Sequence, residues 1–539
     1  MKGTVVFVSA LQKNSAFQDD LLRKLGGKTL IERAIDKARQ LNVEDSAIHV
    51  YTDVESVSLL AERTGVNVYL DEEFLVGARV TRQKFYGYLL QSLDSAGWLL
   101  RLSPYAPLLA VATITGAQDT LKRNGNLIAV GEQLIYEQSL DDQTTMVINE
   151  LLDQQHEGKN IRSDIFTLLR AKAIREEIGK PLRVSFVDVG EDGFEVRSYQ
   201  DWWVCEKLLQ RKRIVFRVVG NREVGMGHIY RALSLAHEIT DHEVIFVTDT
   251  ENEMAINELE RYDYRLEVCK PDDVVTTILA LKPNLVVNDI LDTSMEDVVP
   301  LQSIGSAVVN FEDLGEGAKM ANATINELYD DPQYQGSNTY WGNQYFFVRD
   351  EFSAATPCEF REKVEALLLA FGGVDQHDLT RKILFTVLDL CRLRDIHIYV
   401  VTGPGYAPYQ ELAQQINNMD GVTLTHATGV ISRIMEKVSL AITSNGRTVY
   451  EMAHMNIPAI VIPQHEREKT HAFACEANGF IPLEPYNEPI TKTETLTSLT
   501  HLLDRTDYRR RLYNNTTRYR FDRNKQRVIE LIGRLMQQS

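Results

Sequence analysis

The chain has 539 residues, of which 44% are hydrophobic and 25% are charged, and its formal net charge is -18. This length predicts two or three domains, and the composition is that of a soluble globular protein. The negative charge argues against nucleic acid as the main partner, because a polyphosphate backbone would be repelled. It does not exclude a nucleotide ligand, since a small phosphate site needs only local donors.

The cysteine pattern and the apolar runs indicate the compartment. Five cysteines lie far apart without paired metal-ligand spacing, which predicts free thiols in a reducing environment. The apolar run at the start is too short for a signal peptide, and no later run approaches the length of a membrane span. We therefore expect a cytoplasmic protein with no membrane span, no metal and no cofactor.

The first two hundred residues alternate between strand and helix patterns. We predict strands at residues 3–9, 47–52 and 66–70, and helices at residues 29–41 and 56–63. Alternation of this kind predicts a parallel sheet with helices on its faces. The fold class of this domain, residues 1–210, is therefore α/β.

Four segments of this domain carry a family resemblance. Residues 25–35 (LGGKTLIERAI), 51–53 (YTD), 102–108 (LSPYAPL) and 198–208 (SYQDWWVCEKL) together resemble a cytidylyltransferase of the CMP-sialic acid synthetase type. The resemblance implies a nucleotidyltransferase-like, Rossmann-type domain. However, the basic first loop of that family is replaced by a stretch with Asp19 and Asp20, which would repel a triphosphate. We expect an inactive domain, although Lys13 could take over the role of the missing basic residues.

A polar section at about residues 131–180 interrupts this domain. Its apolar residues have helical spacing, which predicts an amphipathic helical insertion: Ile148, Leu151, Leu152, Ile165, Leu168 and Leu169. The alternative is a dimer contact, because the resemblance implies a homodimer formed through an inserted region at this place.

Residues 214–236 read as a buried strand, a glycine loop and a helix. The loop contains Gly225, Gly227 and His228, and Arg231 follows one turn later. Glycines let a backbone approach a ligand closely, and the helix that follows offers free N–H groups to an anion. The order Gly-x-Gly-His-x-x-Arg after a strand therefore predicts a phosphate-bearing ligand, although a lone histidine is more often structural than catalytic.

The alternation of strands and helices continues to the end of the chain in two sets. The first set spans residues 211–355 and the second spans residues 356–539. Two successive Rossmann-like halves with a cleft between them describe a GT-B fold, in which ligands bind at the carboxyl ends of the strands.

Two turns of the second set are expected to hold a nucleotide. A double-glycine loop, Gly372 and Gly373, follows the opening strand of this half. The turn after the strand that ends at Thr443 offers hydroxyls, an amide and a guanidinium to a diphosphate. One helical turn later, a carboxylate can accept hydrogen bonds from ribose hydroxyls. The expected binding residues of this turn are Ser444, Asn445, Gly446, Arg447, Thr448 and Glu451. A plain tight turn and a helix cap are the alternative interpretations.

His465 completes the predicted site. It lies in a segment, residues 463–472, that resembles the one touching the donor sugar in lipid II-forming N-acetylglucosamine transferases. His465 and His471 are six residues apart, which does not fit a pair of zinc ligands on one helix face. We therefore expect a role in substrate binding and no metal.

The segment from residue 214 to about residue 479 most closely resembles the UDP-sugar hydrolase of pseudaminic acid biosynthesis. Besides the His228 loop, the matches are Arg217 and residues 311–313, 349–352 and 371–375. The resemblance implies a UDP-sugar substrate and His228 as the catalytic base. Residues 289–291 depart from the family pattern Asp-His-Tyr, so a tyrosine that assists at the sugar is absent.

These features predict a hydrolase that releases an amino-sugar from UDP in nonulosonic (sialic-like) acid biosynthesis. One alternative is a GT-B glycosyltransferase that uses the same nucleotide-sugar for surface glycan synthesis. The other is a non-catalytic nucleotide-sugar binding scaffold, which the degenerate first domain would suit.

Overall fold

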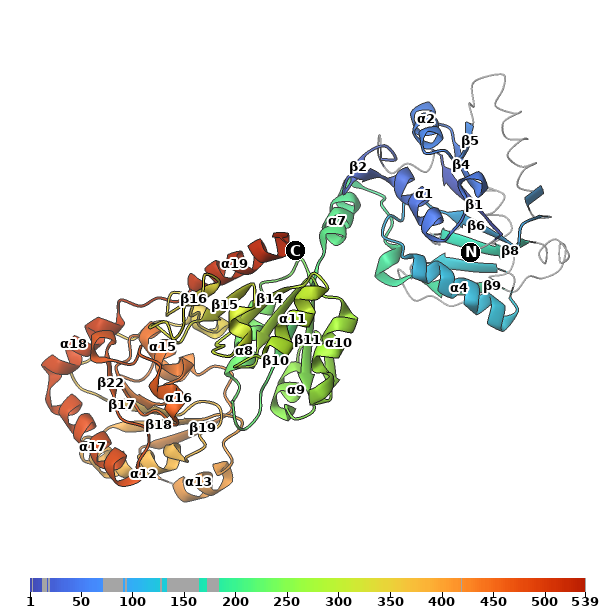
Figure 1. The fold of residues 1–539 in the computed structure, drawn as a ribbon. Helices are drawn as coiled ribbons and strands as arrows, with labels where there is room; N and C mark the ends of the chain where they lie inside the picture. The colour runs from blue at the N-terminus through green and yellow to red at the C-terminus, as the bar shows by residue number, and fades with distance from the viewer. Residues whose placement is uncertain are drawn as a thin grey trace. The chain divides into compact units, whose positions relative to one another are not determined.

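The computed structural model describes residues 1–539 except residues 2, 12–16, 18–19, 71–90, 93–94, 127, 133–163, 172–183, 418 and 539. The chain divides into two compact units, Met1–Arg211 and Lys212–Ser539. Each unit is built on parallel strands, as the ribbon in Figure 1 shows.

Unit 1 contains a seven-stranded sheet. Its order is β5-β4-β1-β6-β8-β7-β9, and β8 runs antiparallel to both of its neighbours. The strands are β1 (Thr4–Ala10), β4 (Ile48–Thr52), β5 (Asn67–Leu70), β6 (Trp98–Leu102), β7 (Ile128–Glu132), β8 (Asp164–Arg170) and β9 (Val184–Asp188). The helices are α1 (Leu30–Gln40), α2 (Glu55–Arg63), α4 (Val111–Asn124) and α7 (Tyr199–Gln210). A capping box of Thr29 and Glu32 starts α1, whose apolar side is buried against the sheet.

The predicted helical insertion is wrong for its last part. Ile165, Leu168 and Leu169 lie on strand β8, which pairs with β6 on one side and β7 on the other. A short strand buried on both faces reads as a continuous apolar run, and periodicity cannot distinguish such a run from a buried helix. The other residues of that prediction, Ile148, Leu151 and Leu152, lie outside the described residues, as do Lys13 and Asp19.

Unit 2 begins with a parallel sheet whose order is β12-β11-β10-β13-β14-β15-β16. The strands are β10 (Arg213–Val218), β11 (Glu243–Asp249), β12 (Arg265–Cys269), β13 (Leu285–Asp289), β14 (Ala307–Phe311), β15 (Ala323–Asn326) and β16 (Thr339–Trp341). The helices of this first half are α8 (Gly227–Ala236), α9 (Glu253–Leu259), α10 (Val274–Leu281) and α11 (Met295–Ser303). Because all of these strands are parallel, their carboxyl ends lie along one edge of the sheet.

The second half of unit 2 is a parallel sheet in the order β19-β18-β17-β20-β21-β22. The strands are β17 (Ala366–Ala370), β18 (His397–Thr402), β19 (Val422–His426), β20 (Leu440–Thr443), β21 (Ala459–Val461) and β22 (Phe480–Pro482). The helices are α12 (Leu379–Leu393), α13 (Tyr409–Ile416), α14 (Ser432–Met435), α15 (Arg447–His454), α16 (Glu466–Lys469), α17 (Glu488–Asp504) and α18 (Thr506–Thr516). The predicted α/β class, with two Rossmann-like halves after a Rossmann-type domain, is confirmed.

The last helix, α19 (Asn524–Gln538), crosses back to the first half. The division made from sequence places it in the second half, but Val528, Leu531 and Ile532 pack into the core of the first half with Ile214 and Phe347. Lys525 adds an ion pair with Glu238, which follows α8. Helix α19 therefore ties the two halves of unit 2 together.

The described residues bear on the expected absence of a membrane span and on the state of the cysteines. No helix in them is long and apolar enough to cross a bilayer. All five cysteines are free thiols. The cytoplasmic location stays a prediction.

Truncating Ile532 tests the packing of α19. Ile532 is 1% exposed, so Ile532→Ala leaves a cavity and is expected to lower the free energy of unfolding by about 2–4 kcal/mol. Urea denaturation of the full chain measures this loss. The matched control is Arg534→Ala on the exposed side of the same helix, with an expected change within about 0.5 kcal/mol. Equal effects of the two substitutions would contradict the packing.

Candidate functional site

A cavity of about 330 Å³ lies between the two halves of unit 2. It is formed by the loops that follow the carboxyl ends of the strands on both sides, the usual place for a ligand in parallel α/β sheets. Except for Asn445, every residue predicted for the site lines it: Gly225, Gly227, His228, Arg231, Gly372, Gly373, Ser444, Gly446, Arg447, Thr448, Glu451 and His465.

His228 lies in the first turn of α8 and is 5% exposed. Its Nδ1 is 2.6 Å from Oδ1 of Asp289, the last residue of β13. A carboxylate can only accept, so Nδ1 carries the proton and donates it, which leaves Nε2 as the basic nitrogen. Burial alone would raise the pKa of Asp289, but Arg231 and His228 outweigh it and hold that pKa at about 2. Asp289 is therefore an anion that fixes the tautomer of His228.

Arg231, one turn along α8, is the centre of a buried ion cluster. Its Nε donates to Oδ2 of Asp289 at 2.8 Å. Its Nη1 donates to Glu312 and to Glu327, each at 2.9 Å. Burial would lower the pKa of Arg231, but Asp289 and Glu312 raise it above its ordinary value. The cluster joins α8 to the carboxyl ends of β13, β14 and β15.

Glu327 extends this cluster to the second half. It is fully buried, and its Oε1 accepts a hydrogen bond from Nη1 of Arg447 as well as from Arg231. Arg447 also donates to the carbonyl of Phe347 at 2.9 Å and stacks over the ring of Phe346 at 4.6 Å. Burial, together with the nearby Arg231, lowers the pKa of Arg447 to about 10. The guanidinium of Arg447 therefore lines the cavity while it is paired with Glu327.

Arg349 and Glu451 form a second link between the halves. Nε of Arg349 donates to Oε1 of Glu451 at 3.0 Å. Burial would lower the pKa of Arg349, but Glu451 and Glu351 raise it. In the part of the chain that the structure describes, no hydrogen bond reaches Oε2 of Glu451. That oxygen can accept from a ligand while Oε1 stays paired.

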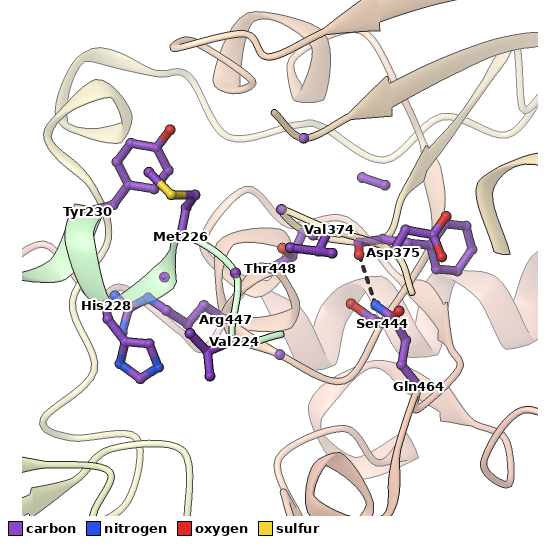
Figure 2. Close-up of a pocket in the computed structure, with 18 of the residues that line it drawn as sticks. Val224, Met226, His228, Tyr230, Val374, Asp375, Ser444, Arg447, Thr448 and Gln464 are labelled. Atoms are coloured by element: carbon purple, nitrogen blue, oxygen red, sulfur yellow. Dashed lines mark hydrogen bonds between the residues drawn. The ribbon is translucent and has the colours of Figure 1, made fainter. Parts of the chain in front are cut away.

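Glycine loops from both halves touch at the floor of the cavity. Gly225 and Gly372 have φ values of 76° and 80°, a conformation that side chains disfavour. A Cβ on Gly373 would lie 3.3 Å from the backbone nitrogen of Met226, and a Cβ on Gly403 only 2.3 Å from the carbonyl oxygen of Gly373. Figure 2 shows Met226 and His228 of the first half across from Thr448 and Ser444 of the second.

The N-termini of two helices lie at the cavity and have no side-chain cap. These are α8, preceded by Met226, and α15, preceded by Gly446. Their first N–H groups and dipoles favour an anion. By contrast, the N-terminus of α12 is filled, because Asp375 accepts from the N–H groups of Leu379 and Thr380 at 2.8 and 2.7 Å. An anion in the cavity therefore has α8 and α15 as its helical partners.

The side chain of Asn445 does not line the cavity, and its expected role in ligand binding stays a prediction. Nδ2 of Asn445 donates to the carbonyls of Glu468 at 2.7 Å and His471 at 3.0 Å, on the far side of the turn. A short amide after a strand reaches neighbouring backbone more easily than it reaches into the cavity.

His465 lines the cavity and caps α16, its ring accepting the N–H of Glu468. Burial lowers the pKa of His465, and Arg467 adds to this effect.

Sequence reasoning gave no role in the site to the residues that hold His228 and Arg447 in place, although Asp289 and Glu312 lie in segments that it compared with the hydrolase family. Asp289, Glu312 and Glu327 stand at or directly after the ends of three neighbouring strands, β13, β14 and β15. The rule that ligands bind at the carboxyl ends of parallel strands would have pointed to them. Arg467 was also missed. It donates to Tyr329 at 3.0 Å and to Asp292 at 3.1 Å across the cleft.

No family model matches the chain. The uncharacterized protein MJ1062 of Methanocaldococcus jannaschii is 27% identical over 270 residues, which are 46% of this chain and 55% of that protein. The spore coat polysaccharide biosynthesis protein SpsG of Bacillus subtilis is 26% identical over 265 residues, which are 47% of this chain and 78% of that protein. The chain thus spans about half the length of the first relative and most of the second.

Solved structures match more distantly. MurG of Acinetobacter baumannii has a TM-score of 0.44 at 12% identity, over 60% of this chain and 99% of that chain. Anabaena HepE in complex with UDP and glucose has a TM-score of 0.39 at 13% identity, over 60% and 100% of the two chains. At these scores the similarity transfers no activity to this chain.

Removing Arg231 tests the ion cluster. Arg231→Met removes the shared partner of three buried carboxylates, of which Asp289 keeps only His228 and Glu327 keeps only Arg447. It is expected to cost about 3–5 kcal/mol of unfolding free energy at pH 8. In the wild type the depressed pKa of Asp289 contributes stability above about pH 4, which is lost as the pH falls through about 2. Without Arg231 the carboxylates take up protons when folded, so the deficit should shrink at pH 5.

Urea denaturation at both pH values measures this deficit. Arg265→Met is the matched control, since Arg265 is exposed, its partner Glu267 is half-buried, and pairs at the surface contribute about 0–1 kcal/mol. A deficit that does not change between pH 8 and pH 5 would show that the three carboxylates do not depend on Arg231.

Proposed function

We propose that unit 2 is a nucleotide-sugar hydrolase that cleaves a UDP-sugar and releases an amino-sugar for nonulosonic (sialic-like) acid biosynthesis. The observation that carries this proposal is the pair of His228, at the start of α8, and Asp289, at the end of β13; His228 lines the cavity that α15 also faces. A histidine oriented by a carboxylate is a general base, and a free helix N-terminus is an anion site.

In the proposed reaction His228 activates water. Nε2 accepts a proton as the water oxygen attacks the anomeric carbon of the sugar, and Asp289 stabilises the imidazolium that forms. The bond between the anomeric carbon and the phosphate oxygen breaks, and its electron pair leaves with the diphosphate. The products are a free sugar and UDP.

The second half holds the departing nucleotide. The N–H groups at the start of α15 and the hydroxyls of Ser444 and Thr448 surround the place proposed for the diphosphate. Glu451 lies one turn further on, where Oε2 can accept from ribose hydroxyls while Arg349 holds Oε1. In this scheme the charge that develops on the leaving group meets dipoles that are already oriented.

Glycosyl transfer to a hydroxyl acceptor is the second candidate, and the relationship to SpsG favours it. That relative is a spore coat polysaccharide biosynthesis protein. Leu291 lines the cavity where the tyrosine of the hydrolase pattern is expected, which also weakens the case for hydrolysis. The two reactions share the nucleotide site and His228, and they differ only in the acceptor.

Replacing His228 tests the general base. His228→Ala is expected to lower the kcat for UDP-sugar cleavage by about 10²- to 10⁴-fold, with little change in UDP affinity. A coupled assay for released UDP, with and without candidate acceptors, measures the rate and separates hydrolysis from transfer. His237→Ala, at the other end of the same helix, should keep the activity. Full activity of His228→Ala would show that another group is the base, whereas absence of UDP-sugar cleavage in the wild type would favour a nucleotide-sugar binding scaffold.

Replacing Glu451 tests the ribose contact. Wild-type protein should bind UDP more tightly than 2′-deoxy-UDP in calorimetric titration. Glu451→Ala is expected to weaken UDP binding by about 10- to 100-fold and to remove that discrimination, because a hydrogen bond to a charged group is lost. Glu466→Ala, an exposed carboxylate on α16, is the control and should change neither affinity. Discrimination that survives in Glu451→Ala would place the ribose elsewhere.

A further inference from the structure

Glu468 on α16 presents one carboxyl oxygen to the turn that leads into α15. Its Oε2 accepts the N–H groups of Gln464 at 2.7 Å and Asn445 at 3.3 Å. Its Oε1 receives no hydrogen bond from any described residue. A Cβ placed on Gly446 would lie 3.8 Å from Oε1, and both Glu468 and Gly446 line the cavity. One oxygen is anchored and the other is available at the proposed diphosphate site.

The surrounding contacts hold this carboxyl group in position. The side chain of Asn445 binds the carbonyl of Glu468 at 2.7 Å, and the ring of His471 lies 2.7 Å from the carbonyl of Asn445. The N–H of Glu468 donates to the ring of His465. Glu468 therefore cannot leave the turn without breaking several hydrogen bonds.

No lysine or arginine among the described residues forms an ion pair with Glu468. The titratable groups that face it are His465 at the N-cap of its own helix, His471 after that helix, and His377 from the loop before α12. Arg447 and Arg467 lie nearby but are paired with Glu327 and Asp292 of the first half. Burial raises the pKa of Glu468. An anion in the cavity would raise that pKa further, because like charges repel.

We propose that Glu468 binds the diphosphate of the ligand as a neutral carboxylic acid, with its proton on Oε1 and donated to a phosphate oxygen. Oε2 keeps the two backbone N–H groups throughout. The proton comes from solvent, so one proton is taken up for each ligand bound when the free carboxyl is ionised. The inference rests on the proposed function, which supplies the diphosphate, and it adds a ligand contact that makes binding depend on pH.

The test is calorimetric titration of the full chain with UDP between pH 7 and pH 8.5, in buffers of different ionisation enthalpy. Phosphate has its second pKa near 6, so the charge of UDP is constant in this range. Wild-type protein is expected to take up close to one proton per UDP. Its affinity should fall by up to about tenfold per pH unit, as linkage requires for one bound proton.

Glu468→Gln places an amide N–H donor in the same position without a titrating group. It is expected to bind UDP without proton uptake, with an affinity that does not change with pH. At pH 8.5 it should bind about tenfold or more tightly than the wild type. Glu466→Gln, exposed on the same short helix, is the matched control and should keep the proton uptake of the wild type.

Three results would overturn the inference. Proton uptake that persists in Glu468→Gln would assign the proton to a histidine of the cavity. UDP binding by the wild type without proton uptake would show that Glu468 stays ionised. Wild-type protein that does not bind UDP at all would overturn the proposed function as well, so the two failures are distinguishable.

Discussion

The buried guanidinium of Arg231 is the interaction on which the site depends. A buried arginine needs acceptors around it, and for Arg231 these are the carboxylates of Asp289, Glu312 and Glu327 at the ends of three neighbouring strands. These contacts fix the first turn of α8 against the edge of the sheet. Asp289 serves Arg231 and His228 at once, so the position of the proposed base follows from the same ion cluster.

The cluster also sets how the halves of unit 2 meet. Glu327 is shared between Arg231 of the first half and Arg447 at the start of α15. Loss of either arginine would leave a fully buried carboxylate with one partner fewer, which a low-dielectric interior penalises. This closure also needs glycine at position 373, because a Cβ there would lie only 3.3 Å from the backbone nitrogen of Met226. Ion pairs and glycines therefore specify one closed cavity.

The parts of the site that sequence could predict are those coded locally. A strand, a glycine loop and a helix follow one another within some twenty residues around His228, and the turn before α15 has the same local pattern. The partners that hold these groups are remote in sequence. Asp289 lies 58 residues from Arg231 and Glu327 lies 96 residues from it, so only the order of strands in the sheet brings them together.

The same limit explains the errors. Strand β8 is buried on both faces, and its apolar run fits a buried helix as well as a buried strand. Only its pairing with the neighbouring strands β6 and β7 distinguishes the two. The side chain of Asn445 belongs to the right turn, but its direction depends on carbonyls of Glu468 and His471 that sequence cannot place. Residue type and local pattern thus predict which loops form the cavity. Which side chains enter it is decided by tertiary contacts.

The charges of the cavity then decide how it can hold an anion. Arg231, Arg349, Arg447 and Arg467 all line it, and each is paired with carboxylates of the protein. Their net field at a ligand is therefore weak, and the proposed diphosphate has its donors mainly in uncharged groups, the backbone N–H groups at α8 and α15 and the hydroxyls of Ser444 and Thr448. Such groups carry no charge to be neutralised and are oriented before the ligand arrives. A site built in this way favours ligands whose charge is small or shared with a proton.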